Sequence, residues 1–125
     1  MDHLLDLWGT AIDAYPEVNS FQLWSRDPGG FEADVLKTQP ELLLNLVNRF
    51  YEMIRRRRPD AGIVFAAWGI DTSEIPLVAD ALPKDVRVTE PPLIHCQART
   101  MEEYAERIKT WQDRGVHVET WLEVQ

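Results

Sequence analysis

Apolar residues recur along the chain with two different spacings, which predict an alternation of helices and strands. Stripes spaced three and four residues apart indicate amphipathic helices, whereas short alternating or continuous apolar runs indicate strands. The strongest helical stripe begins beside Pro40 and ends at Pro59, both ordinary helix boundaries. Thr100 and Glu103 have the spacing of a capping box at the start of another helix. The predicted helices cover residues 3–14, 39–58, 74–82 and 100–114.

Segments with strand character lie between and after these helices. The segment "GIVFAAW" is almost continuously apolar, which is typical of a central strand with both faces covered. One helix comes first, and strands and helices then alternate. Such alternation favours right-handed parallel crossovers and an α/β fold. The predicted strands cover residues 20–25, 62–68, 85–90 and 116–124.

The two faces of the strands distinguish a barrel-like sheet from an open one. In the last strand, Val116 and Val118 share one face, and His117 and Glu119 share the other. The first and third predicted strands also have only one apolar face. An open doubly wound sheet is covered by helices on both sides, so both of its faces should be apolar. One apolar and one polar face is instead expected of a (β/α) barrel, with the polar face toward the lumen.

Residues 1–125 are therefore predicted to form a single α/β domain of four parallel strands that resembles half of a (β/α)8 barrel. Four strands cannot close a barrel, because the smallest well-filled barrels have about eight. Three arrangements remain possible: a portion of a larger barrel, a pairing with a second copy, or an open sheet with one polar face exposed to solvent. A sheet with two free edges and exposed tryptophans invites association, so a homodimer or a larger assembly is expected.

Charge and composition argue against two classes of binding partner, nucleic acids and membranes. The net charge of -8 at pH 7 argues against nucleic acid as a partner. The run Arg55–Arg58 is best explained by its place at a helix C-terminus, where cations complement exposed carbonyls, and a patch that binds anions or nucleic acid is the alternative. Cys96 is the only cysteine, so no disulfide can form within the chain and a cytoplasmic location is expected. No apolar run reaches the ~20 residues that span a bilayer, so no membrane partner is expected.

Candidate chemistry gathers at the predicted carboxyl ends of the strands, where parallel α/β folds carry their sites. An indole can stack on the apolar face of a sugar ring, and carboxylates can accept hydrogen bonds from its hydroxyls. Two carboxylates across a cleft can also act as acid and base on a glycosidic bond. Asp27 and Glu90 are the predicted catalytic carboxylates. The predicted substrate-binding residues are Trp24, Arg26, Trp68, Asp71, Glu119 and Trp121.

Structural explanations exist for the same residues. Tryptophans in α/β domains mostly serve packing. Asp27 stands before "PGG" and is a good turn initiator, and Asp71 is a good N-cap for the helix that follows. Glu119 and Glu123 lie about 13 Å apart along a strand, too far for a close catalytic pair.

No metal or organic cofactor is expected from the sequence. His95, Cys96 and His117 match no zinc-binding spacing. The glycines at 29 and 30 do not form a dinucleotide-binding fingerprint, because no helix is predicted directly after them.

Three stretches carry a resemblance to a known family: "YPEVNSFQLWSRDPGGFE", "RRRRPDAGIVFAAWGI" and "LPKDVRVTEPPLIH". Together they resemble part of the catalytic (β/α) barrel of glycoside hydrolases of the α-glucuronidase and hexosaminidase-like kind. The resemblance covers roughly residues 15–95. It implies that Arg26 and Asp27 belong to a sugar-contacting loop and that Trp68 forms a wall of the pocket. A complete barrel of this kind needs about 250 residues, so half of it is absent from this chain.

These observations leave three functional hypotheses. The first is a glycoside-hydrolase-like barrel portion, which needs the remainder of a barrel or a second copy for catalysis. The second is a carbohydrate-binding or small-ligand-binding module without chemistry. The third is a structural domain that associates with itself through the wet face of its sheet. A carbohydrate ligand is the expected small-molecule partner in the first two.

Overall fold

A computed structural model describes residues 2–24, 40–91 and 98–120 of the chain. Helices and strands alternate as the sequence predicts, and every boundary within these ranges agrees to within about two residues. The elements are α1 (Asp2–Ala14), β1 (Ser20–Trp24), α3 (Pro40–Arg57), β2 (Gly62–Ala66), η1 (Thr72–Glu74), α4 (Ile75–Ala81), β3 (Arg87–Glu90), α5 (Met101–Asp113) and β4 (Val118–Thr120).

The four strands form one sheet in the order β1-β2-β3-β4, and each neighbouring pair is parallel. Each strand therefore lies next to the strand that precedes it in the sequence. This order is the one found in (β/α) barrels, whereas a doubly wound sheet reverses its order at a switch point. The predicted fold class, an α/β sheet of parallel strands alternating with helices, is confirmed.

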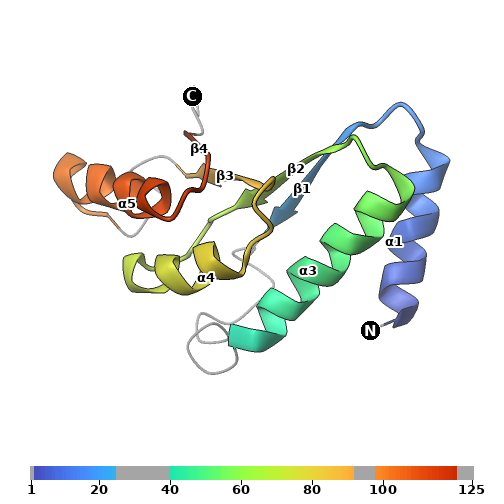
Figure 1. Cartoon of the computed structure of the whole chain (residues 1–125), viewed down its shortest axis with the longest axis horizontal. Coiled ribbons are helices and arrows are strands. Elements are labelled where there is room, and N and C mark those ends of the chain that lie inside the picture. The colour runs from blue at the N-terminus through green and yellow to red at the C-terminus, as the bar shows by residue number, and fades with distance from the viewer. Residues whose placement is uncertain (1, 25–39, 92–97, 121–125) are drawn as a thin grey trace.

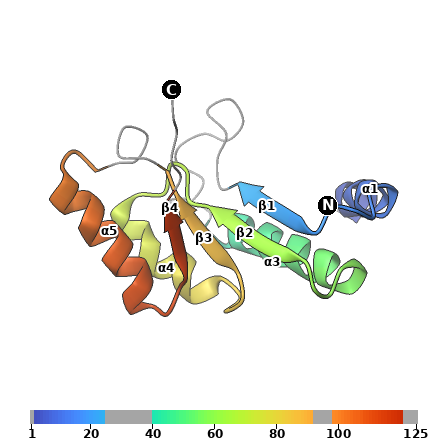
Figure 2. The same ribbon diagram turned by 90° about the horizontal axis from the view of Figure 1, so that it is seen from above.

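Helices α3, α4 and α5 lie in one layer on one side of the sheet, and α1 stands beyond β1 beside α3 (Figures 1 and 2). The core lies between this layer and the sheet, and it includes Ile63, Phe65, Val88 and Trp111, all fully or almost fully buried. Each buried side chain of this size contributes about 1.5–3 kcal/mol. The opposite face of the sheet carries no helix among the described residues, and we call it the helix-free face.

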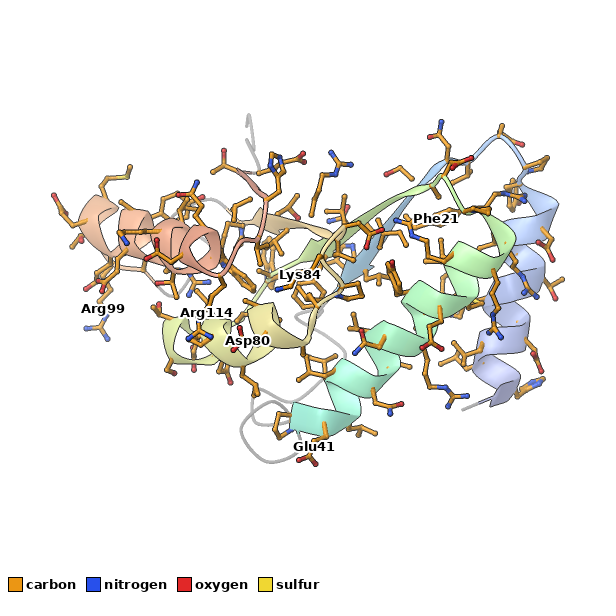
Figure 3. All side chains as sticks on the ribbon, viewed as in Figure 1. Phe21, Glu41, Asp80, Lys84, Arg99 and Arg114 are labelled. Atoms are coloured by element: carbon orange, nitrogen blue, oxygen red, sulfur yellow. The ribbon has the colours of Figure 1, made fainter. Side chains whose placement is uncertain are left out.

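On β1 and β3, the side chains on the helix-free face are those that the sequence assigns to the polar side, whereas β2 places Val64 and Ala66 there. The register pairs Gln22 with Val64 and Val64 with Arg87, so these three side chains form one row across the sheet. Phe21 lies on the other side of β1 and packs against the core (Figure 3). The prediction of one apolar, helix-covered face and one polar face is therefore correct for β1, β3 and β4, whereas β2 is apolar on both faces.

Arginines at the end of α3 form ion pairs and hydrogen bonds with neighbouring segments. Arg55 donates to the Asp85 carboxylate at 2.6 Å, and Arg58 donates to the Ile12 carbonyl at 3.2 Å. Gly9 faces the end of the Arg57 side chain, and a Cβ at this position would require the guanidinium to move. Arg55, Arg57 and Arg58 thus make contacts within the fold, to Asp85, Asp13 and the Ile12 carbonyl respectively.

Candidate functional site

Two tryptophans come together where β1 and β2 end. Trp24 is the last residue of β1, and Trp68 follows β2 by two residues. Their ring centroids lie 6.2 Å apart with a 32° angle between the ring planes. The Trp24 side chain is 46% exposed. The pair therefore offers aromatic surface to solvent at the carboxyl edge of the sheet.

The row of side chains that contains Trp24 crosses the whole sheet on its helix-free face. The register places Trp24 beside Ala66, Ala66 beside Thr89, and Thr89 beside Glu119. Ala66, between the indole and the hydroxyl in this row, is almost fully buried. The Thr89 hydroxyl oxygen is buried and has no hydrogen-bond partner in the described part of the chain. Of the predicted binding residues, Trp24, Trp68 and Glu119 are thus brought to one edge of one face.

Glu119 is held by charged neighbours on the same face. Arg87 donates to Glu119 Oε1 at 2.7 Å, and His117 Nε2 lies 3.6 Å from the same oxygen. All three side chains keep contact with solvent. They form a polar patch beside the row that contains Trp24, and this patch can accept and donate hydrogen bonds.

Glu90 has a different environment from the other predicted site residues. It alternates with Thr89 and faces the helices, where it is fully buried. Arg107 Nη2 donates to both carboxylate oxygens at 3.0 Å, and the Trp111 indole N–H donates to Oε1. Arg107 also donates to the Thr72 hydroxyl at 3.2 Å. Burial raises the pKa of Glu90, although the Arg107 charge and the hydrogen bonds from Trp111 and Arg107 act in the opposite direction.

These contacts give Glu90 a structural role. It fastens α5 to the end of β3 through a charge pair that is closed to solvent. Its proposed part in catalysis stays a prediction. A catalytic carboxylate must contact its substrate, and the side chain here contacts Arg107 and Trp111 instead.

Asp71 is also used by the fold. It is the N-cap of η1, and its backbone N–H donates to the Glu74 carboxylate at 2.8 Å, which completes a capping box. Asp71 is therefore an N-cap residue, as the structural explanation from the sequence predicted. Arg26, Asp27 and Trp121 lie outside the described residues, so their predicted roles stay predictions.

Sequence reasoning missed two features. The first is the buried group formed by Glu90, Arg107 and Trp111; its signal was an arginine and a tryptophan four residues apart on the apolar face of α5. The second is an open apolar cavity of about 520 Å³ between α1, β1 and α3. No pattern along the chain encodes a cavity, because it depends on how closely helices pack.

The comparisons identify no relative. No known protein family matches the chain, and no curated protein sequence or solved structure is significantly similar to it. Within residues 2–24, 40–91 and 98–120, no helix has the length and apolar character needed to cross a membrane. In those same ranges, no three histidine, cysteine or acidic side chains converge on a position where a metal ion could bind.

Proposed function

We propose that the chain binds a carbohydrate at the carboxyl edge of its sheet, with the indoles of Trp24 and Trp68 as the stacking surface. The observation that carries the proposal is this aromatic pair, partly exposed at the edge where parallel α/β folds place their ligands. The apolar face of a sugar ring packs on an indole, and its hydroxyls need polar partners nearby. The Glu119 carboxylate lies in the same row of the sheet as Trp24, is partly exposed, and can supply such a partner.

We favour binding over hydrolysis because Glu90 and Glu119 are each paired with an arginine. A glycosidase needs two carboxyl groups that face each other across the scissile bond. Glu90 is buried against Arg107, and Glu119 is paired with Arg87. Hydrolysis by a completed barrel therefore depends on Asp27 together with a second carboxylate from elsewhere, which makes it the second candidate.

Titration with neutral and acidic sugars, followed by tryptophan fluorescence, tests the proposal. We expect a saturable change with at least one sugar class. Trp24→Ala and Trp68→Ala should each weaken binding at least about fivefold, because an aromatic contact of this kind contributes about 1 kcal/mol. Trp8→Phe is the matched control, since it removes an indole from α1 and keeps an aromatic ring. The absence of any saturable response, or full affinity in Trp24→Ala, contradicts the proposal.

An activity assay separates the two candidates. Aryl glycosides and aryl uronosides release a coloured phenol when they are hydrolysed. A binding module gives no release above that of a buffer blank. Release that Asp27→Asn abolishes, with sugar binding retained, would favour the hydrolase candidate instead.

A further inference from the structure

The apolar cavity between α1, β1 and α3 lies at the free edge of the sheet. Its lining includes Trp8 and Tyr15 of the α1 region, Phe21 and Leu23 of β1, and Phe50 of α3. Trp8 and Tyr15 are more than half exposed although both are large and aromatic. In (β/α) barrels each helix packs over a pair of neighbouring strands. Helix α1 stands beyond β1 beside a cavity, so it has the position of a cover for a further strand next to β1 (Figure 2).

The backbone of β1 has hydrogen-bonding groups that point away from β2 and could pair with such a strand. The Asn19 carbonyl accepts from the Gly62 N–H at 2.8 Å, so Asn19 faces β2. Backbone groups alternate in direction along a parallel strand, and Phe21 and Leu23 therefore also face β2. The N–H and C=O of Gln22 then face away from β2, toward the free edge beneath α1.

Strand β4 is the other edge of the sheet and has complementary features. The His117 carbonyl accepts from Val88 N–H at 2.9 Å, so the neighbouring Val118 directs its backbone groups away from β3. Val116 and Val118 pack on the helix side of the sheet and are only partly buried. A strand like β4 placed beside β1 would direct such valines toward the apolar cavity.

We propose that the occupant of this position is β4 of a second copy of the chain. Each copy then places its β1 beside the partner's β4, and the two sheets close into an eight-stranded parallel barrel with two equivalent junctions. Eight is the number of strands in the smallest well-filled barrels. The helix-free face becomes the lumen, and each α1 covers the partner's β4.

The surface of α1 fits this arrangement. Leu4 and Leu7 are exposed on α1, although the helix already packs on α3. Trp8 contacts Phe50 of α3 edge-on and still keeps about half of its surface exposed. In a closed pair, α1 lies beside the partner's α5, whose Met101 is exposed and whose Ile108 is only partly buried. Both apolar surfaces would leave water together, which is the usual driving force for subunit association. The proposal does not depend on sugar binding and is tested separately from it.

The first test is the mass of the chain in solution. Light scattering coupled to size exclusion should give twice the chain mass of 14.5 kDa. Gln22→Pro removes an outward-facing N–H without removing a bond of the β1–β2 ladder, and it should raise the dimer dissociation constant at least about tenfold. Gln22→Ala is the control and should remain dimeric. Circular dichroism and thermal unfolding check that the proline variant is folded.

A second pair of variants tests the role of α1. Leu7→Asp places a charge on the exposed side of α1, and Leu77→Asp places the same charge on α4; the two leucines are 62% and 46% exposed. The proposal expects dissociation with Leu7→Asp only. A monomeric wild type overturns it, and so does a dimer that tolerates both Gln22→Pro and Leu7→Asp. A monomer that binds an apolar dye in the cavity would show that a small ligand, and not a second copy, is the occupant.

Discussion

At the scale of single residues, the fold depends on a buried charge. Glu90 and Arg107 are almost completely removed from solvent, and their pairing joins β3 to α5. Two buried charges are tolerated only when they satisfy each other, because each loses its hydration on folding. The sequence placed Glu90 correctly at the end of a strand. Alternation also puts Glu90 on the apolar face of that strand, beside Val88. The sequence could not show that Arg107 would reach it, because that contact joins residues 17 positions apart.

Replacing Glu90 should therefore be costly. Glu90→Gln leaves Arg107 buried without a counter-charge, and we expect a loss of about 3–5 kcal/mol in the free energy of unfolding. Asp80→Asn is the control, because it breaks the exposed pair with Arg114 and should cost about 0–1 kcal/mol (Figure 3). Urea denaturation measures both. If the two variants lose similar stability, Glu90 does not have the structural role assigned to it.

The pH dependence of stability has a separate source at Asp85. Partial burial raises the pKa of Asp85, but hydrogen bonds from Tyr51 and Arg55 outweigh that effect and hold the pKa below its ordinary value. A depressed pKa in the folded state stabilises the fold above the unfolded pKa and loses this effect as the pH falls through the folded pKa. The contribution of Asp85 to the free energy of unfolding should therefore decrease as the solution becomes more acidic.

Asp85→Asn tests this assignment. At neutral pH the variant should be less stable than the wild type by up to about 1 kcal/mol, because the pair is half exposed and screened by water. The difference should shrink as the pH drops below the ordinary aspartate range, since the wild type then loses the same charge. Unfolding curves recorded at several pH values measure it. A difference that stays constant with pH would contradict the role of the Asp85 charge.

At the scale of elements, local patterns were sufficient for most of the fold. The helix over residues 39–58 became α3 (Pro40–Arg57), and the one over 100–114 became α5 (Met101–Asp113). Proline, capping residues and apolar stripes act within one or two turns, so a single sequence displays them. The helix predicted at 74–82 is preceded by the 3-10 turn η1, where Asp71 and Glu74 form the cap. What the patterns could not show was packing between elements, such as the space left beside α1.

The start of α5 provides a test at this scale. The Thr100 hydroxyl accepts a hydrogen bond from the Glu103 N–H at 3.2 Å, as the capping-box spacing predicts. Thr100→Ala should lower the free energy of unfolding by about 1 kcal/mol. Thr110→Ala is the matched control, because Thr110 lies inside the same helix and its hydroxyl donates to the Glu106 carbonyl. It should be close to neutral, and a larger loss at Thr110 than at Thr100 would contradict the assignment of the cap.

At the scale of the whole molecule, the described residues form a barrel-like sheet in which β1 and β4 are the outer strands. The strand order and the layer of helices on one side follow from the sequence, because alternating elements and one-sided strands permit few topologies. The candidate site was only partly predictable. The tryptophan pair could be anticipated from the ends of parallel strands, whereas the burial of Glu90 and the cavity beneath α1 depend on contacts over long distances in the sequence.

Amide hydrogen exchange at the edge of β1 tests the closed pair most directly. Phe21 and Gln22 are neighbours, but only the Phe21 N–H bonds within the chain's own sheet. If β4 of a second copy pairs with β1, the Gln22 amide should exchange slowly, at a rate close to that of Phe21. If Phe21 is protected while Gln22 exchanges as fast as an unstructured peptide, the edge is open and the account of a barrel closed by two copies is wrong.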